Sequence, residues 1–429
     1  MDVVQGEIVL NPGIEIRSGK FVGFGIDNQE QINRLELDTN DYILPGLIDL
    51  HAHYRVAHSG IAKDDTVVMP RLFLANGVTA TFPAGEIEPY KMRHLSTRIA
   101  SGKTPGPRIL HSGPYFGTAA PDWSQDFTVH DINQRVDLWA GLGVKGFKAK
   151  GISPDHLEAL IKRAHQYGLT VTAHLNSGMN GSVNPEQAIE MGIDRVEHFL
   201  GGALLVDTTH AYNSLAAMDP SDPVLDEVIT KYVENQVYFD ATVATYGAIG
   251  MVDEPPFKMW ADEEEYLTPY VRKLIATYTR SDFSKLCEKI YYVKKSVVKR
   301  FYDAGGLITI GSDRPLLVDN YLGTGLGGFF IHREMRVLVE AGIEPMSVIQ
   351  MATLQNAKAI GVSDQLGSIE ISKWADLAIV KGNPGKDITN TRNVHAVVMG
   401  GRLYQSKELL QYCVGRLGPK SKESWLEED

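Results

Sequence analysis

Short apolar segments alternate with amphipathic segments along most of the chain. The short segments are bounded by glycine and polar turns and predict strands, whereas the amphipathic segments between them predict helices. The predicted strands cover residues 42–53, 77–83, 108–112, 143–148, 169–174, 193–198, 236–243 and 306–313. One intervening helix follows Ser153 and ends at Gly168, and another follows Asn184 and ends at Gly192.

Eight strand-then-helix units predict an α/β fold, and specifically a (β/α)8 TIM barrel over residues 41–363. A doubly wound open sheet is the alternative that the same alternation allows. In a (β/α)8 barrel, the residues that carry chemistry stand at the carboxyl ends of the strands. The ends of the predicted strands are therefore the places where functional side chains are expected.

The two ends of the chain show a different pattern, with short alternating strands and turns of glycine and asparagine. Residues 1–40 and 364–410 therefore predict one small composite β-sandwich domain. Residues 411–429 are expected to form a C-terminal tail with a frayed polar end. Residues 244–305 are too long for one barrel connection, so we expect an insertion near the barrel mouth, with either a surface excursion or a lid around Trp260.

The composition indicates a folded globular chain. With 429 residues, of which 43% are hydrophobic, the chain can bury a large core. Its net charge of −11, without a dense cluster of Lys and Arg, argues against nucleic acid or an anionic membrane as a partner. No apolar run approaches the ~20 residues of a membrane span. Two isolated cysteines favour a reducing, cytoplasmic location. An export signal that has been trimmed from the chain is an alternative. The sequence is also compatible with a homo-oligomer.

The segment LPGLIDLHAH places His51 and His53 two residues apart on the first predicted strand. Side chains two apart on a strand share a face, so both imidazoles are expected to point into the barrel and form half of a metal site. An HxH pair alone is equally compatible with two polar core histidines. Position favours the metal interpretation, because three further polar residues end predicted strands: His174, His198 and Asp313.

Lys148 ends the fourth predicted strand and would direct an ammonium group toward this cluster, which is electrostatically unfavourable. A lysine that has reacted with carbon dioxide carries instead an anionic carbamate, which can bridge two metal ions. Lys145 is expected to point outward by strand parity, and Lys150 lies beyond the strand end. Lys148 is therefore the candidate for a carbamate.

This constellation resembles the amidohydrolase superfamily, whose members are metal-dependent hydrolases built on a (β/α)8 barrel with a small β-domain. The segment LPGLIDLHAH is similar to the family's first-strand signature, and LGSIEISKWADLAIVKGNP is similar to its returning C-terminal segment. Within the superfamily, GVKGFKAKGISPDHLEALIKRAHQYGLTVTAHLNSG and GIDRVEHFLGG are most similar to the prolidase-like and imidazolonepropionase-related branch, which holds two metals.

The resemblance implies a role for each residue of the set. His51 and His53 would bind one divalent ion, and Asp313 would bind the same ion and act as the catalytic residue for proton transfer. His174 and His198 would bind a second ion, and carboxylated Lys148 would bridge the two. Imidazole and carboxylate ligands suit zinc best, with manganese, cobalt or iron as alternatives. Two such ions lower the pKa of a shared water and polarise a scissile carbonyl.

Three residues are candidate substrate contacts. Arg55, in HAHYR, shares the parity of the two histidines and could clamp a substrate carboxylate, as in the similar HxHxR arrangement of the dihydroorotase branch. The alternative is an ion pair between Arg55 and Asp64 or Asp65 on a surface loop. Tyr246 follows the seventh predicted strand and is a candidate to contact an oxyanion or a carboxylate, whereas Tyr115 either lines the pocket or packs in the core.

The sequence favours an enzyme that hydrolyses an amide C–N bond in a small molecule, with a dipeptide of the prolidase type as the first candidate. A cyclic amide or imide, as in the hydantoinase branch, or a lactone would use the same residues. Deamination fits less well, because the mononuclear deaminase branch generally lacks the fourth-strand lysine and no helix-borne HxxE stands in the usual place. A non-catalytic scaffold relative should have lost ligands, whereas all six are present here.

Overall fold

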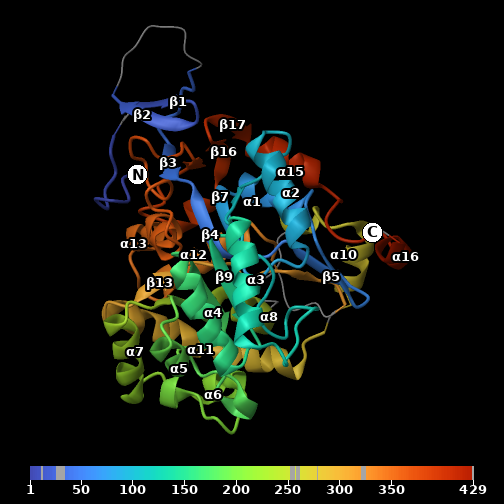
Figure 1. The fold of residues 1–429 in the computed structure, drawn as a ribbon. Coiled ribbons are helices and arrows are strands. Elements are labelled where there is room, and N and C mark those ends of the chain that lie inside the picture. Colours follow the sequence, from blue (N-terminus) through green and yellow to red (C-terminus); the bar gives the residue numbers. More distant parts are fainter. Residues whose placement is uncertain are drawn as a thin grey trace.

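Helices alternate with parallel strands through most of the chain in the computed structural model (Figure 1). The structure describes residues 1–10, 13–25, 34–251, 257, 261–277, 279–319 and 325–427. The surface excursion or lid expected around Trp260 lies outside these residues. None of the described helices is long and apolar enough to span a bilayer.

Eight parallel strands coincide with the eight predicted strands. Three of them form one sheet in the order β4 (Leu47–Ala52), β7 (Val78–Pro83) and β8 (Arg108–Ile109). The other five form a second sheet of β9 (Gly146–Lys150), β10 (Thr170–His174), β11 (Arg195–Glu197), β12 (Tyr238–Asp240) and β13 (Leu307–Thr309). The predicted α/β architecture with parallel strands is therefore confirmed.

A few backbone hydrogen bonds connect the two sheets at each seam. Leu50 N donates to Ile310 O over 3.1 Å beside β4 and β13, and Phe116 N donates to Lys148 O over 2.9 Å beside β8 and β9. Strand pairing among the described residues nevertheless gives two separate sheets, of three and of five strands, and not one closed barrel.

The helices that alternate with these strands begin and end close to the predicted positions. The helix expected after Ser153 is α4 (Pro154–Gln166), and the helix expected after Asn184 is α5 (Pro185–Glu190). The Asn184 side chain caps α5 by accepting a hydrogen bond from Glu186 N over 3.0 Å. The others are α1 (Met69–Ala75), α2 (Pro89–Ala100), α3 (Val129–Gly141), α6 (Ala211–Ala217), α7 (Val224–Glu234), α12 (Phe330–Glu340), α13 (Pro345–Gln350) and α14 (Asn356–Ala359).

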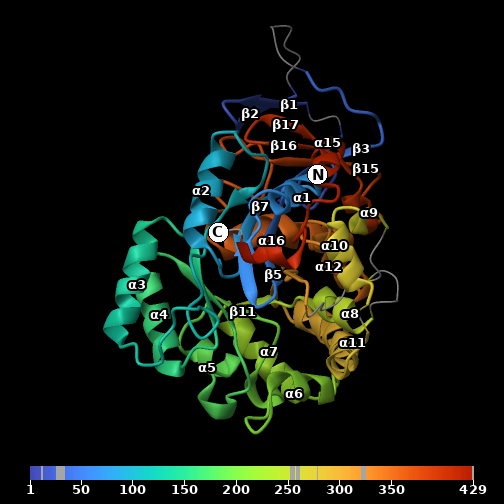
Figure 2. The ribbon, with the colours of Figure 1, turned by 90° about the vertical axis from the view of Figure 1, so that its right-hand side faces the viewer.

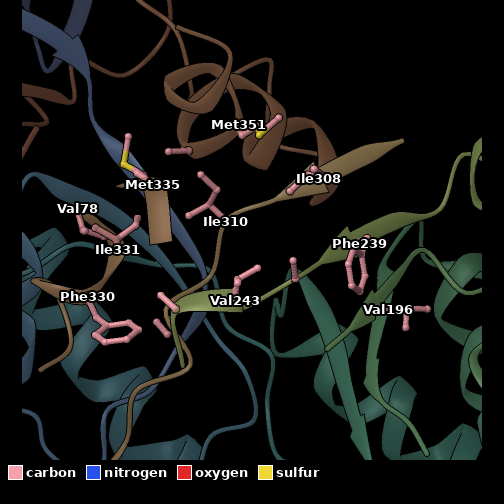
Figure 3. Packing of buried hydrophobic residues seen from close by; sticks show 14 of the residues in the cluster. Val78, Val196, Phe239, Val243, Ile308, Ile310, Phe330, Ile331, Met335 and Met351 are labelled. Atoms are coloured by element: carbon pink, nitrogen blue, oxygen red, sulfur yellow. The ribbon is translucent and has the colours of Figure 1, made fainter. Parts of the chain in front are cut away.

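Alternation along the strands divides apolar from polar side chains. Val196, Phe239 and Ile308 share one face of neighbouring strands and belong to the same buried cluster as Ile331 and Met335 of α12 (Figure 3). The opposite face of these strands carries buried polar and charged residues, which are Lys148, Thr172, Arg195, Glu197, Asp240 and Thr309. The sheets therefore enclose a polar interior, while their apolar side packs against the helices.

The prediction of one continuous strand over residues 42–53 is wrong. The structure divides it into β3 (Asp41–Pro45) and β4, because Gly46 lies so close to Thr79 that a Cβ would stand 1.9 Å from its Oγ1. Strand β3 pairs antiparallel with β15 (Leu377–Lys381), which pairs in turn with β16 (Val394–Met399) and β17 (Arg402–Gln405). Segments from both ends of the chain therefore build one four-stranded sheet.

A hairpin of β1 (Ile14–Arg17) and β2 (Lys20–Phe24) lies beside this sheet, and both views show the blue and red strands together (Figures 1 and 2). Phe21 N donates to Lys373 O over 3.1 Å. Phe21 is also buried with Ala375, Leu377 and Val398. The hairpin is therefore held to the C-terminal strands by both hydrogen bonds and apolar contacts.

The described part of the long segment after β12 is mainly helical. It contains α8 (Val243–Gly250), α9 (Ala261–Glu264), α10 (Pro269–Ile275) and α11 (Asp282–Asp303). Helix α10 contacts a second hairpin, of β5 (Arg55–His58) and β6 (Ile61–Asp64), through Tyr270 OH, which lies 3.1 Å from His58 Nε2. Short strand β14 (Leu316–Leu317) pairs with β5.

The prediction of a frayed C-terminal end is wrong for the residues up to 427. After α15 (Ser406–Cys413), the chain forms α16 (Lys422–Glu427), which lies next to β5 in both views (Figures 1 and 2). Trp425 is buried, and its indole Nε1 donates to Ile61 O over 3.4 Å. One aromatic residue in a polar segment thus fixes the terminal helix on the β5–β6 hairpin.

Candidate active site

Four of the six predicted metal ligands converge near the carboxyl ends of the parallel strands. His53 Nε2 lies 3.1 Å, and His51 Nε2 lies 3.4 Å, from Asp313 Oδ1. His198 Nε2 lies 4.0 Å from the other carboxylate oxygen, Asp313 Oδ2. Three imidazole nitrogens therefore surround one carboxylate.

His174 stands at the edge of this cluster. Its ring centroid lies 4.5 Å from that of His198, which in turn lies 5.2 Å from His51. The predicted pairing of His174 with His198 is thus compatible with their placement.

Lys148 extends into the same interior from the middle of β9 and is 1% exposed. Its amine contacts Glu197 Oε2, and the other oxygen of that carboxylate accepts a hydrogen bond from Thr172 Oγ1 over 3.0 Å. Burial lowers the pKa of Lys148 well below its usual range. A buried lysine beside four histidines is therefore held in place by a buried carboxylate.

The donor set fits divalent metal ions. Two groups of described residues each place their ligand atoms within 4.8 Å of one another: His51, His53 and Asp313, and His51, Glu197 and His198. Burial lowers the pKa of all four histidines, so that their imidazoles are neutral near pH 7 and can bind a metal ion. The first group contains the residues expected for the first ion, whereas the second contains Glu197 in place of His174 and Lys148.

Neighbouring side chains leave the Nε2 atoms of two histidines free for a metal. His51 Nδ1 donates to Asp240 Oδ2 over 2.7 Å. Thr242 Oγ1 donates to Ala241 O over 2.8 Å, so it can only accept from His198 Nδ1, at 2.6 Å. Carboxylate or hydroxyl partners of this kind orient metal-binding imidazoles and fix their tautomer.

Three residues of the site have left-handed backbone conformations. Their φ angles are 67° for His198, 46° for Thr242 and 44° for Asp313. None of the three lies within its preceding strand, since β11, β12 and β13 end at residues 197, 240 and 309. Side-chain direction at these positions is therefore set by turns after the strands and not by the strand pleat.

The candidate substrate residues lie around this cluster. Tyr246, in the middle of α8, is buried with its ring centroid 6.3 Å from that of His198. Tyr115 is buried against Gly85, and burial raises the pKa of its hydroxyl, a shift that the positive charge of Arg55 opposes. The alternative partners of Arg55 are used elsewhere, because Asp64 and Asp65 accept hydrogen bonds from backbone amides and neither forms an ion pair with Arg55.

The sequence profile of the Amidohydrolase family matches residues 42–404. The chain belongs to the Amidohydrolase family. That match includes every residue of the buried cluster described above, from His51 to Asp313. The resemblance found in the motifs is therefore confirmed.

Solved structures of other proteins share the fold of this Amidohydrolase family member. An Xaa-Pro dipeptidase with bound methionine in the active site is 21% identical, with a TM-score of 0.70, and the alignment covers 94% of this chain and 97% of that protein. A molinate hydrolase is 19% identical, with a TM-score of 0.65, and covers 98% of this chain and 96% of that protein. At such identities the likeness establishes the fold alone.

Curated relatives match over short segments only. A 5-methylthioadenosine/S-adenosylhomocysteine deaminase of Teredinibacter turnerae is 38% identical over 82 residues, which are 16% of this chain and 19% of that protein. Adenine deaminase 3 of Rhizobium meliloti is 33% identical over 92 residues, which are 21% of this chain and 14% of that protein. The matching segment thus spans no more than about a fifth of either relative.

Two buried carboxylates of this family member were not predicted as functional. Glu197 and Asp240 are the last residues of β11 and β12 and contact Lys148 and His51 respectively. A signal was present for Glu197, a carboxylate next to the end of the predicted strand 193–198, whereas Asp240 lies in the middle of the predicted strand 236–243. His198, which directly follows Glu197, was predicted as the ligand at this strand end instead.

Proposed function

We propose that this protein is a binuclear metal-dependent hydrolase that cleaves an amide C–N bond in a small molecule. One observation carries the proposal: the Nε2 atoms of His51, His53 and His198 converge on Asp313 within 4.0 Å. Neutral imidazoles and a carboxylate are typical ligands of a divalent metal ion. Their convergence in a buried interior therefore supports a metal site.

His51, His53 and Asp313 would hold one ion, and His174 and His198 the second, with a carbamate on Lys148 as the bridge. Zinc suits these ligands best, with manganese, cobalt or iron as alternatives. When bound, such ions supply an activated water and polarise the scissile carbonyl. The nearness of Glu197 to His51 and His198, at 3.7 and 3.9 Å, makes it a further candidate ligand.

The remaining steps belong to side chains of the chain itself. Asp313 accepts the proton that the attacking water loses and delivers it to the leaving nitrogen. Tyr246, whose ring centroid lies 6.3 Å from that of His198, would donate a hydrogen bond to the developing oxyanion. Arg55 binds a carboxylate of the substrate through its guanidinium, and Tyr115 lines the pocket beside it.

A dipeptide of the prolidase type is the first substrate class, and a cyclic amide, an imide or a lactone would use the same residues. The dipeptidase whose fold this chain shares supports that order. We also propose that the eight strands form a (β/α)8 barrel over residues 41–363. Residues 1–40 and 364–410 would form the small β-sandwich domain, to which strand β3, at the start of the barrel segment, is joined by its pairing with β15.

Metal analysis and substrate turnover test the proposal. We expect two divalent ions per chain after a chelator-free preparation, and turnover of at least one compound from a panel of dipeptides, acylated amino acids, hydantoins and lactones. Lys148→Ala should lose metal and activity, and a short carboxylic acid should partly restore activity, while Lys145→Ala, on the exposed outer face, should change neither. Metal-loaded protein that turns over no member of the panel would favour the scaffold alternative.

A further inference from the structure

A buried lysine interrupts the apolar face of helix α11. The buried residues of this helix follow a helical repeat, and most of them are apolar, including Cys287, Ile290, Val297 and Phe301. Lys294 stands in the middle of the same face and is 3% exposed. An apolar side chain would fit this position of the repeat, and a buried amine costs free energy unless it has hydrogen-bond partners. A role of the amine is therefore expected here.

One contact of Lys294 lies at the backbone of a predicted metal ligand. Its Nζ donates to the carbonyl oxygen of His198 over 2.8 Å. The amide of His198 donates in turn to Asp240 O over 3.0 Å. His198 has a left-handed backbone conformation, with φ at 67°, which is uncommon for a residue other than glycine. A hydrogen bond on each side of its Cα thus holds His198 in the turn that directs its imidazole.

A second contact of the same amine lies at Tyr246, the proposed donor to the oxyanion. Lys294 Nζ lies over the buried Tyr246 ring, 4.3 Å from its centroid. An N–H group above an aromatic face is attracted by the π electrons of the ring. Helix α8 is also held at its first turn, where Glu334 accepts hydrogen bonds from Val243 N and Ala244 N over 2.9 and 2.7 Å. The helix and the ring that it carries are therefore fixed by separate contacts.

Close packing of α11 on α8 brings the amine to this place (Figure 2). At Gly250, the last residue of α8, a Cβ would stand 2.3 Å from Glu288 N of α11. His198 follows β11 and Tyr246 belongs to α8, and their ring centroids lie 6.3 Å apart. One amine of α11 therefore joins a ligand of the proposed second ion to the proposed oxyanion donor.

We propose that Lys294 is a positioning residue that sets His198 for the second metal ion and Tyr246 for the oxyanion. This inference rests on the proposed hydrolase function, in which both of these residues take part. Lys294 acts through them and is a ligand of neither metal ion nor substrate.

The first experiment measures metal binding. Lys294→Met keeps a long, unbranched side chain and removes the amine. We expect the variant to bind the second ion at least ~10-fold more weakly, the range for residues that orient metal ligands, and to bind the first ion as the parent does. Competition with a chromogenic chelator measures both dissociation constants. Lys294→Leu serves the same comparison if the methionine variant does not fold.

The matched control is Val297→Ala. Val297 is 5% exposed and lies one turn further along the same buried face of α11, so its truncation loosens the packing of the helix without removing the amine. Both dissociation constants should stay at the values of the parent. A loss of metal affinity in Val297→Ala equal to that in Lys294→Met would overturn the inference, because loosened packing would then be sufficient.

A double-mutant cycle at saturating metal tests the contact with Tyr246. Tyr246→Phe removes the hydroxyl, keeps the ring and should lower kcat by ~10²-fold or more. Because Lys294 acts through the position of that hydroxyl, Lys294→Met should lower kcat by ~10-fold or more in the parent but by much less in Tyr246→Phe. A residue that only stabilises the fold would lower kcat by the same factor in both backgrounds.

The outcomes separate the inference from the proposed function. In a protein that turns over a substrate, unchanged dissociation constants in Lys294→Met would overturn the positioning of His198, and equal factors in the cycle would overturn that of Tyr246. Either result would leave the hydrolase function intact. Weaker binding of the second ion by Lys294→Met, in a protein that turns over no member of the substrate panel, would support the positioning of His198 and refute the proposed function.

Discussion

Asp313 has two assigned roles, metal binding and proton transfer, which one substitution can separate. Asp313→Asn preserves the side-chain shape and the left-handed backbone conformation, since asparagine tolerates positive φ. We expect the variant to keep most of its metal, because four histidines and Lys148 remain, and to lose ~10²-fold or more in kcat. Metal analysis and steady-state kinetics on one preparation measure both quantities. Unchanged kcat would assign proton transfer to another group.

Asp240 acts on the metal centre through His51. Its carboxylate accepts from His51 Nδ1 over 2.7 Å, which orients the imidazole and favours the tautomer with a free Nε2. Asp240→Asn should therefore weaken metal affinity by roughly 10- to 100-fold. Competition with a chromogenic chelator measures the dissociation constant. An Asp240→Asn protein that binds metal as tightly as the parent would show that His51 needs no such partner.

At the scale of elements, the β5–β6 hairpin is held from two sides. On one side, His58 Nδ1 lies 2.7 Å from Asp319 Oδ1, and its Nε2 faces Tyr270 of α10. On the other side, Trp425 of α16 packs on β6, with Lys63 Nζ 5.1 Å from the centroid of the indole. Since Arg55 begins this hairpin, the position of the substrate cation depends on both contacts.

Trp425→Ala tests that dependence. Removing a buried indole should cost about 3 kcal/mol of stability locally and loosen the hairpin. We expect KM for a carboxylate substrate to rise while kcat changes little, because the histidines and Asp313 are untouched. The matched control is Leu426→Ala, whose side chain is 47% exposed and should alter neither quantity. An equal fall in kcat for Trp425→Ala would mean that α16 supports the metal centre as well.

The sequence predicted elements better than the turns between them. All eight parallel strands were predicted because apolar alternation is a local property of each segment. The division of 42–53 was missed, since the contact of Gly46 with Thr79 joins distant parts of the chain. His198 and Asp313 were predicted to end strands, but the structure holds both in turns after the strands, with a left-handed backbone that a hydrophobic pattern does not reveal. Trp425 lay in a polar segment with no periodic pattern.

At the scale of the whole molecule, buried histidines make stability depend on pH. His332 of α12 does not belong to the metal cluster, and its Nε2 donates to Asn76 O over 3.0 Å. Burial lowers its pKa from 6.5 to about 3. Below pH 6.5 the unfolded chain binds a proton at this residue that the folded chain excludes, so stability falls as the pH decreases from 6.5 toward 3.

His332→Gln keeps a donor for Asn76 O and removes the titrating group. We expect the variant to be less stable at pH 7 but to lose stability less steeply in acid, by up to about 1.4 kcal/mol per pH unit, which corresponds to one proton. Urea unfolding of metal-free protein at several pH values between 4 and 7 gives the two slopes. Parallel slopes would show that His332 is protonated in the folded protein.

The pairing of β3 with β15 also bears on the order in which the chain can fold. The strand that leads directly into His51 and His53 finds its partner only among residues near the other end of the polypeptide. During synthesis, β3 must therefore wait with an unpaired edge until almost the whole chain has left the ribosome, and such edges promote aggregation. A nascent chain that stops before β15 would retain the metal-binding histidines but lack the sheet that anchors their strand, so premature termination should yield aggregated protein and not a shorter active enzyme.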